Sequence, residues 1–321
     1  MLVPVLLFAL GLILLIKGGD WFVDGATGIA HRFHIPELLI GATIVSAGTT
    51  LPEVMVSASS ALSGHGEIAY GNAIGSIICN TALIAAITIA VRPPKVEGAS
   101  LKVPVMFFFG AAVIYAGVAY FMGEFTRWVG LLLMAIFACY MAYNILRVKK
   151  LPAQPAEDAP AKTATSLVRD VIGLVLGAAA IAFGADLLVD NGTLIAQALG
   201  VPESVIALTF VALGTSLPEL VTAITSLVKG HGSLSLGNII GANLFNLVWV
   251  SGMSVTLSPF AVPASKTIAG MNASLVVDIP LMFFVMAFMT LPAIIRGKLQ
   301  RWQGITLLCV YAVYIGFQFF G

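Results

Sequence analysis

Long apolar runs restrict the fold of this chain more than any other feature. A helix needs about 20 apolar residues to cross a bilayer. Runs of that kind cover approximately 2–24, 38–62, 67–91, 103–122, 126–147, 167–189, 204–228, 233–257, 275–295 and 302–320. Hydrophobic residues make up 59% of the 321 and charged residues only 10%, which is more apolar surface than a soluble domain of this length needs. The sequence therefore predicts a helical protein that crosses a membrane many times.

The basic residues indicate how these helices are oriented. With the N-terminus outside, fourteen of the sixteen Lys and Arg residues fall on the inner side, and only Arg127 and Lys266 fall outside. Cytoplasmic loops of membrane proteins carry an excess of Lys and Arg, so both termini are predicted to lie outside. The net charge of +1, without a basic stripe, argues against nucleic acid as a partner.

A long internal repeat divides the sequence into two halves. Residues 18–80, shifted by 166 positions onto 184–246, are identical at 26 of 63 positions without a gap. The Pro- and Ala-rich charged segment 149–166 separates the halves and is predicted to be a cytoplasmic linker. The two predicted repeats therefore cover 1–148 and 167–321, with five spans each.

An odd number of spans in each repeat has a topological consequence. The second repeat must enter the membrane from the face opposite to the first, which makes the repeats inverted. The predicted fold class is an all-α polytopic membrane protein of ten transmembrane helices, arranged as two inverted five-helix repeats. This architecture is typical of secondary transporters, which bind their substrate at the bilayer midplane where interrupted helices of the two repeats meet.

The repeated words GTTLPE and GTSLPE place a proline directly before a glutamate inside apolar spans. In the first copy, Pro52 cannot donate a hydrogen bond to the carbonyl of Gly48. The oxygen atoms freed around Ala47 and Gly48 need other partners, which lipid does not offer. A bound cation would satisfy them, together with the carboxylate of Glu53.

Hydroxyl groups accompany both glutamates. Thr49 and Thr50 lie four and three residues before Glu53, so both lie near its face of the helix. The second copy repeats the pattern with Thr215, Ser216, Pro218 and Glu219. Carboxylate, hydroxyl and carbonyl oxygens are the ligands that hard cations such as Ca²⁺ and Na⁺ prefer. Two facing glutamates would carry a charge of −2, which one Ca²⁺ neutralises, and they would repel each other without a cation or protons.

A second pair of repeated motifs adds amide and hydroxyl groups to the candidate cation ligands. In GNAIGSIICN, Ser76 and Asn80 are four residues apart and share a helix face, whereas Ala242 and Asn246 occupy that face in GNIIGANLFN. Both words contain a G-x-x-x-G pattern, which lets helix backbones approach closely. We expect the third and eighth spans to pack against the second and seventh through these glycines, which are Gly71, Gly75, Gly237 and Gly241.

Other charged residues are interpreted as parts of helix ends. Asp278 precedes Pro280 just as Lys102 precedes Pro104, and an interfacial helix entrance is favoured over a ligand role at both places. Solvation or packing near the ends of the first and sixth spans is favoured for Asp20, Asp24, Asp186 and Asp190.

The paired words GTTLPE…GNAIGSIICN and GTSLPE…GNIIGANLFN give the chain a family resemblance. At these residues it resembles the calcium/cation antiporter superfamily, and within it the prokaryotic sodium/calcium exchanger-like branch, over nearly its whole length. The resemblance implies a secondary active antiporter in the plasma membrane of a prokaryotic cell, exchanging Ca²⁺ for Na⁺ by alternating access. It also implies that the protein works as a monomer surrounded by lipid, without a cofactor besides the transported ions.

The resemblance also implies roles for individual residues. Glu53 and Glu219 match the two calcium-binding glutamates, and Thr49 and Thr215 match the hydroxyl residues beside them. The positions that match sodium-binding or shared ligands are Thr50, Ser216, Ser76, Asn80 and Asn246, with Ser46 and Ala212 offering backbone oxygen.

Two positions depart from the family pattern. Ala242 stands where related exchangers often have a serine, which affects one sodium site and therefore the stoichiometry. Asn246 stands where some relatives, including the potassium-dependent branch, have an aspartate, and the amide argues against potassium co-transport. An H⁺-coupled antiporter of Ca²⁺ or another divalent cation, using the same glutamates, is therefore the alternative mechanism.

A cation channel and an intramembrane enzyme are the alternatives from other classes. A channel would need rings of ligands from several subunits, whereas this chain is itself internally repeated. An enzyme would need a nucleophile or a metal cluster beside the carboxylates, but the apolar spans contain no His and no metal-ligating His/Cys cluster. The sequence therefore predicts a transporter without enzymatic activity.

Overall fold

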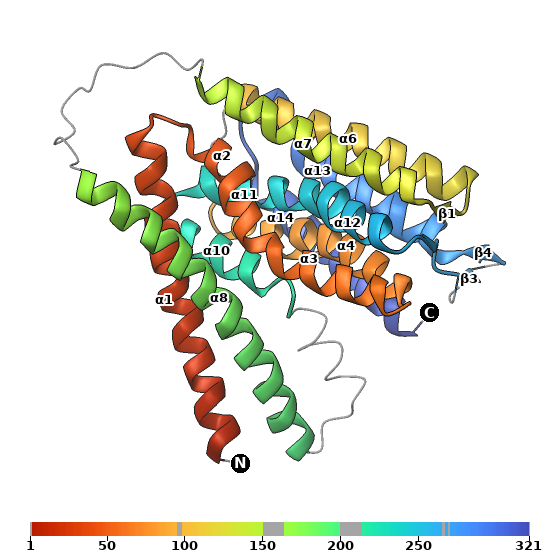
Figure 1. Ribbon diagram of the computed structural model, residues 1–321, viewed down its shortest axis with the longest axis horizontal. Helices are drawn as coiled ribbons and strands as arrows, with labels where there is room; N and C mark the ends of the chain where they lie inside the picture. The colour runs from red at the N-terminus through yellow and green to blue at the C-terminus, as the bar shows by residue number, and fades with distance from the viewer. Residues whose placement is uncertain are drawn as a thin grey trace.

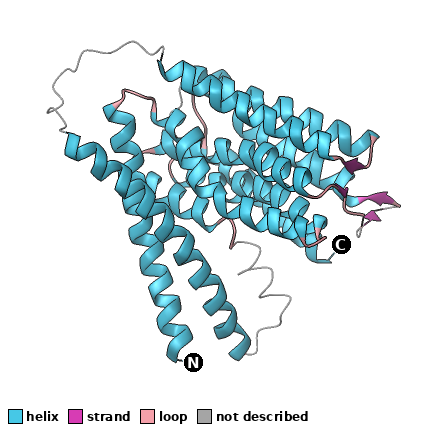
Figure 2. Cartoon of the chain, viewed as in Figure 1, coloured by secondary structure: helices cyan, strands magenta, loops and turns pink. Residues whose placement is uncertain are grey.

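The computed structural model describes residues 2–94, 98–149, 164–199, 214–264, 267–268 and 270–320, which are almost entirely helical (Figure 2). Within these residues, eight helices are long and apolar enough to cross a membrane, and the shorter helix Leu217–Val228 is also apolar. The prediction of a helical multi-pass membrane protein is therefore confirmed. The count of ten helices and the inversion of the repeats remain predictions.

The elements follow one another in the order shown by colour in Figure 1, and η denotes a π-helical segment. They are α1 (Leu2–Arg32), α2 (Glu37–Ile40), η1 (Gly41–Val45), α3 (Ser46–Leu62), α4 (Gly66–Cys79), η2 (Asn80–Ala85), α5 (Ala86–Val91), α6 (Gly98–Phe121), β1 (Glu124–Phe125), α7 (Arg127–Lys149), α8 (Ala164–Ala198), α10 (Leu217–Val228), α11 (Gly232–Phe245), η4 (Asn246–Val250), α12 (Ser251–Leu257), β2 (Phe260–Ala261), β3 (Thr267–Ile268), β4 (Met271–Asn272), η5 (Ser274–Asp278), α13 (Ile279–Arg296) and α14 (Arg301–Phe320).

The four short strands were not expected in an all-helical chain. They form two antiparallel pairs, β1 with β2 and β3 with β4, each only two residues long. All four lie in the connections between membrane-crossing helices, so they do not alter the helical fold class.

Helices α1 and α8 form a tight antiparallel pair that diverges from the other helices (Figure 1). Glycines allow this approach, since a Cβ atom on Gly18 would lie 2.9 Å from the Ile181 nitrogen. A Cβ on Gly25 would lie 2.5 Å from the Asp170 carbonyl oxygen. Small residues at such crossings let two helix backbones pack at short range.

Both helices of this pair are longer than their apolar runs predicted. The first span was expected to end at residue 24, but α1 continues to Arg32 because its last turns bury Ile29 and Ala30. The linker expected over 149–166 is shorter, since Lys149 is the last residue of α7 and α8 begins at Ala164. Most of the linker, 150–163, lies outside the described residues.

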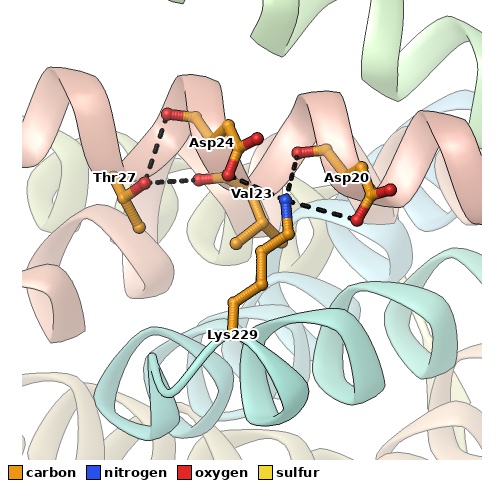
Figure 3. Close-up of polar contacts among 5 residues, drawn as sticks. All are labelled: Asp20, Val23, Asp24, Thr27 and Lys229. Carbon is orange, nitrogen blue, oxygen red and sulfur yellow. Dashed lines mark hydrogen bonds and ion pairs between the residues drawn. The ribbon is translucent and has the colours of Figure 1, made fainter.

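An ion-pair cluster joins α1 to the end of α10 (Figure 3). The Lys229 ammonium lies 2.8 Å from Asp24 Oδ1 and 3.2 Å from Asp20 Oδ1. Burial lowers the pKa of Lys229, but the hydrogen bonds and negative charges of Asp24 and Asp20 outweigh it and raise the pKa above its usual value. The two aspartates therefore lie within α1 rather than at its end, and they bind a lysine while remaining partly exposed.

The centre of the molecule is formed by α3, α4, α11 and α12 (Figure 1). Around them, α7 packs on α12, α14 on α5 and α13 on α6. Every residue of α11 from 234 to 245 is buried, so this helix is enclosed by protein on all sides.

The two G-x-x-x-G motifs have different surroundings among the described residues. A Cβ on Gly237 would overlap the Leu38 carbonyl, and one on Gly241 would overlap the Ser46 hydroxyl and the backbone of Ala42. The expected close packing of the eighth span on the second is confirmed there. Around Gly71 and Gly75 a Cβ would meet no atom of the described residues within 4 Å. The repeat counterparts of Leu38, Ala42 and Ser46, at positions 204, 208 and 212, lie outside the described residues, so the expected packing of the third span on the seventh stays a prediction. 

Candidate ion-binding site

Glu53 and Glu219 come together in the centre of the molecule. Glu53 lies within α3 and Glu219 in the first turn of α10, and both are completely buried. The two carboxylates are close enough to interact electrostatically with each other. The structure thus brings the glutamates of the two sequence repeats into one site.

The polar atoms around these glutamates lack hydrogen-bond partners. Within the described part of the chain, none of the four carboxylate oxygens has a partner. The same holds for the Thr50 hydroxyl and for both side-chain polar atoms of Asn80 and Asn246. Buried polar atoms are nearly always hydrogen-bonded, so a set of oxygen atoms without partners fits a cation that would bind them together.

The hydroxyls of Thr49 and Thr50 lie beside the second glutamate. Both residues are buried and approach the Glu219 carboxylate, although without a hydrogen bond of normal geometry. The face of α3 that carries Thr49, Thr50 and Glu53 is therefore turned toward Glu219 as well. Oxygen atoms from both sequence repeats surround the same volume.

The two proline motifs have different local structures. Helix α3 continues through Pro52, so the proline does not end the helix, and the π-helical segment η1 lies just before α3. In the other copy, Pro218 is in the first turn of α10, and Thr215 and Ser216 lie in the turn that precedes it. Proline suits a first turn because no helical acceptor exists there for its missing N–H.

The remaining predicted ligands are divided between several elements. Asn80 begins η2 and Asn246 begins η4, and both are completely buried. Ser76 lies one turn earlier on α4 and is buried, as is Ala242 on α11. π-helical turns inside α-helices occur frequently at functional sites, and two of them here start at predicted ligands.

Ser46 and Ala212 were expected to offer backbone oxygen. The Ser46 carbonyl accepts a hydrogen bond of 3.4 Å from the Thr49 hydroxyl, and the Ser46 hydroxyl lies 2.7 Å from the Gly41 carbonyl oxygen. Ala212 lies outside the described residues.

Asn238 is a site residue that the sequence prediction missed. Its side-chain oxygen lies 3.2 Å from the Thr49 hydroxyl and 3.3 Å from the Ser46 hydroxyl. Its repeat counterpart Asn72 donates instead to the Ser57 hydroxyl at 2.8 Å and to the Glu53 carbonyl at 3.4 Å. A signal existed, because each asparagine is identical in the two repeats and lies four residues before the Ser76 or Ala242 position.

A cavity of about 610 Å³ leads from the protein surface to the edge of the site. Exposed Glu67 and Gln318 lie in its wall, as do buried Ser76 and Ser216. Since this wall joins exposed residues to two predicted ligands, the cavity is a route by which water and ions can approach.

The donor set of the buried site consists of oxygen atoms. No group of three or more His, Cys, Asp or Glu side chains lies together among the described residues. The buried site instead combines two carboxylates with hydroxyl and amide oxygens, which suits hard cations.

Fold and site define a multi-pass integral membrane protein with buried oxygen ligands between its helices, which is the construction of a transporter rather than an enzyme. A family model described as sodium/calcium exchanger protein matches residues 3–146 and 170–320. The chain belongs to this family of antiporters, within the calcium/cation antiporter superfamily.

Individual relatives match over nearly their whole length. A membrane protein of Methanocaldococcus jannaschii is 34% identical over 313 residues, which cover 96% of this chain and 95% of the relative. The sodium/calcium exchanger MaX1 of Methanosarcina acetivorans is 28% identical over 351 residues, which cover 97% of each protein.

Solved structures show the same fold. A structure of the sodium-calcium exchanger NCX_Mj, soaked with Na⁺ and Sr²⁺, matches with a TM-score of 0.81 and 31% sequence identity. The match covers 98% of each chain. The helical arrangement of this chain is therefore that of a sodium-calcium exchanger.

Proposed function

We propose that this exchanger moves Ca²⁺ against Na⁺ by alternating access, with the ions bound between Glu53 and Glu219. The observation that carries the proposal is the burial of these two carboxylates side by side, with no hydrogen-bond partner among the described residues. Charged groups inside a membrane protein are expensive and mark ion pathways. A single Ca²⁺ would neutralise the pair.

The same electrostatics supports exchange rather than leakage. An occupied site has little net charge and can pass between states that open to opposite faces. An empty site would hold two negative charges at low dielectric, which is unfavourable. Such a protein changes state mainly when loaded, and that coupling makes it an antiporter.

Proton-coupled exchange of Ca²⁺ or another divalent cation is the second candidate. Ala242 offers no hydroxyl where the first repeat has Ser76, and Asn246 offers an amide. Fewer oxygen ligands for Na⁺ favour a mechanism in which protons on Glu53 and Glu219 replace the sodium ions.

We also propose the full topology of ten helices in inverted repeats, with both termini outside and a monomer in lipid as the working unit. The antiparallel packing of α1 and α8 supports the inversion, because these helices carry equivalent parts of the two sequence repeats. The distribution of Lys and Arg supports the orientation.

Uptake of radioactive Ca²⁺ into proteoliposomes tests the coupling ion. Vesicles loaded with Na⁺ should take up Ca²⁺ when they are diluted into Na⁺-free buffer. Vesicles that carry only a proton gradient should not. Uptake driven by protons alone would replace the sodium mechanism by the second candidate.

Substitution of the glutamates tests the site itself. Glu53→Gln and Glu219→Gln keep the side-chain volume and remove one charge each, so each should abolish exchange while the protein remains folded. Glu124→Gln, at an exposed carboxylate on β1, is the matched control and should transport normally. Transport at the wild-type rate by either of the first two variants would refute the site.

A further inference from the structure

The cavity that reaches the site carries charge of one sign. Glu67 and Asp278 lie in its wall, and no Lys, Arg or His is found among the described residues that line it. Glu67 is in the first turn of α4, and Asp278 ends η5. An ion that moves inward therefore passes two carboxylates before it reaches Ser76 and Ser216.

Side chains of α14 hold Asp278 at the cavity wall. The Tyr314 hydroxyl donates to Asp278 Oδ1 at 3.1 Å, and the Gln318 amide donates to the same oxygen at 3.1 Å. Asp278 is also the end of a π-helical segment. The other π-helical segments within the described residues begin at or lie just before predicted ligands, namely Ser46, Asn80 and Asn246.

Tyr70 adds a second, independent feature to this wall. Its side chain is only 3% exposed, and its hydroxyl has no hydrogen-bond partner among the described residues. Tyr70, Ser274 and Asp278 all line the cavity. A buried hydroxyl without a partner needs a bound water or ion.

The equivalent positions of the other sequence repeat do not carry these acidic residues. The position equivalent to Glu67 in the other repeat is Ser233. The position equivalent to Asp278, two residues before the matching proline, is Lys102. The repeated fold therefore does not require acidic residues here, and the other repeat has a basic residue in place of Asp278.

We propose that Asp278, with Tyr70, Tyr314 and Gln318, forms a second cation subsite that holds a hydrated divalent cation in this cavity. The inference rests on the proposed function, since it adds a stop on the route to Glu53 and Glu219. One carboxylate and a few neutral groups cannot supply the 6–8 oxygen ligands of Ca²⁺, so the ion keeps part of its water. Negative charge in a cleft raises the local cation concentration and speeds association.

Luminescence of Tb³⁺, excited through nearby tyrosines, measures this subsite directly. The experiment uses the full chain with Glu53→Gln and Glu219→Gln, so that the central site does not contribute. This protein should bind Tb³⁺ saturably, and Ca²⁺ should compete. Adding Asp278→Asn should lower the tyrosine-sensitised signal at least several-fold, whereas Asp278→Glu should keep most of it.

Two further variants provide controls. Tyr70→Phe keeps the ring and removes the hydroxyl, so it should weaken Tb³⁺ binding by a few-fold. Glu124→Gln removes an exposed carboxylate outside the cavity lining and should leave binding unchanged. The proposal is overturned if the background protein binds no Tb³⁺, or if Asp278→Asn and Glu124→Gln give equal signals.

Transport measured from each face separates this proposal from the proposed function. In otherwise wild-type protein, Asp278→Asn should raise the half-saturating Ca²⁺ concentration on the cavity side roughly fivefold at low salt, with less effect at high salt. The value on the other face and the rate at saturation should stay the same. If Asp278→Asn leaves the half-saturating Ca²⁺ concentration unchanged on both faces, the subsite is refuted, while exchange by the wild type still supports the proposed function. If the wild type shows no exchange, the proposed function alone is refuted, because Tb³⁺ binding is measured without transport.

Discussion

The hydroxyl of Thr49 donates a hydrogen bond of 3.2 Å to the side-chain oxygen of Asn238. The same oxygen lies 3.3 Å from the Ser46 hydroxyl, which also lies 2.9 Å from the Asn238 carbonyl oxygen. An asparagine on α11 thus orients hydroxyl residues on α3. The two halves of the sequence share one hydrogen-bond network beside the paired glutamates.

Removing this asparagine should weaken Ca²⁺ binding. Asn238→Ala removes the side-chain acceptor of the Thr49 hydroxyl, which keeps only its longer contact of 3.4 Å to the Ser46 carbonyl. One hydrogen bond contributes about 0.5–1.5 kcal/mol. We expect the half-saturating Ca²⁺ concentration for exchange to rise up to about tenfold. Thr49→Val should have a similar effect, and the double variant should be less than additive because both residues act in one network. Unchanged affinity or full additivity would argue against the positioning role.

Equivalent substitutions in the two G-x-x-x-G motifs should change the stability of the folded protein differently. Gly241→Ala would push a methyl group into Ser46 and Ala42, so it should destabilise the folded protein by about 1–3 kcal/mol. Gly75→Ala, the matched control, meets no atom of the described residues within 4 Å and should be neutral or slightly stabilising, since alanine is favoured in helices by roughly 0.5–1 kcal/mol. Thermal unfolding in detergent measures both, and equal melting temperatures would contradict the packing.

Restoring a hydroxyl at Ala242 tests the number of sodium ions. Ala242 is completely buried on α11 and corresponds to Ser76 in the first repeat. Ala242→Ser should add an oxygen ligand, so the Na⁺ dependence of Ca²⁺ exchange should become steeper or shift to lower Na⁺. A Hill slope and a half-saturating Na⁺ concentration equal to wild type would count against a sodium ligand at this position.

The ion pairs of Lys229 should stabilise the attachment of α1 to α10. Its partners are partly exposed, so the coupling between Lys229→Met and Asp24→Asn in a double-mutant cycle should be modest, about 0.5–1 kcal/mol. The raised pKa of Lys229 sets the sign with pH. Its contribution is fully present below the unfolded pKa and is lost as pH rises through the folded pKa. A coupling of zero, or one that grows at alkaline pH, would contradict this assignment.

The sequence predicted the broad fold and the centre of the site for identifiable reasons. Long apolar runs indicate that lipid surrounds the helices. The repeated carboxylates could be recognised because charged groups are rare inside a membrane unless they have a function. Helix ends were less predictable. The apolar run of α1 ends near residue 24, but Ile29 and Ala30 continue the helix because they pack against the core.

Other features depend on which helices meet. Gly75 and Gly241 occupy equivalent positions in the two G-x-x-x-G motifs, and among the described residues only Gly241 lies against another backbone. Asn72 and Asn238 are equally alike, yet Asn72 bonds within its own half while Asn238 reaches Ser46 and Thr49 of the other. The shared Gly and Asn positions alone do not distinguish the members of such a pair, because both motifs carry them at the same spacing.

The sequence by itself determined that this chain resides in a membrane, that it is built from a duplicated unit, and that each unit contributes one glutamate with hydroxyl neighbours. These properties follow from composition and spacing, which are local. The tertiary structure contains the predicted meeting of Glu53 and Glu219, and it alone decided that Asn238 contacts Ser46 and Thr49 beside them and that one cavity leads inward past Asp278. Those contacts join residues more than 150 positions apart in the sequence, where only the packing of whole helices brings side chains together.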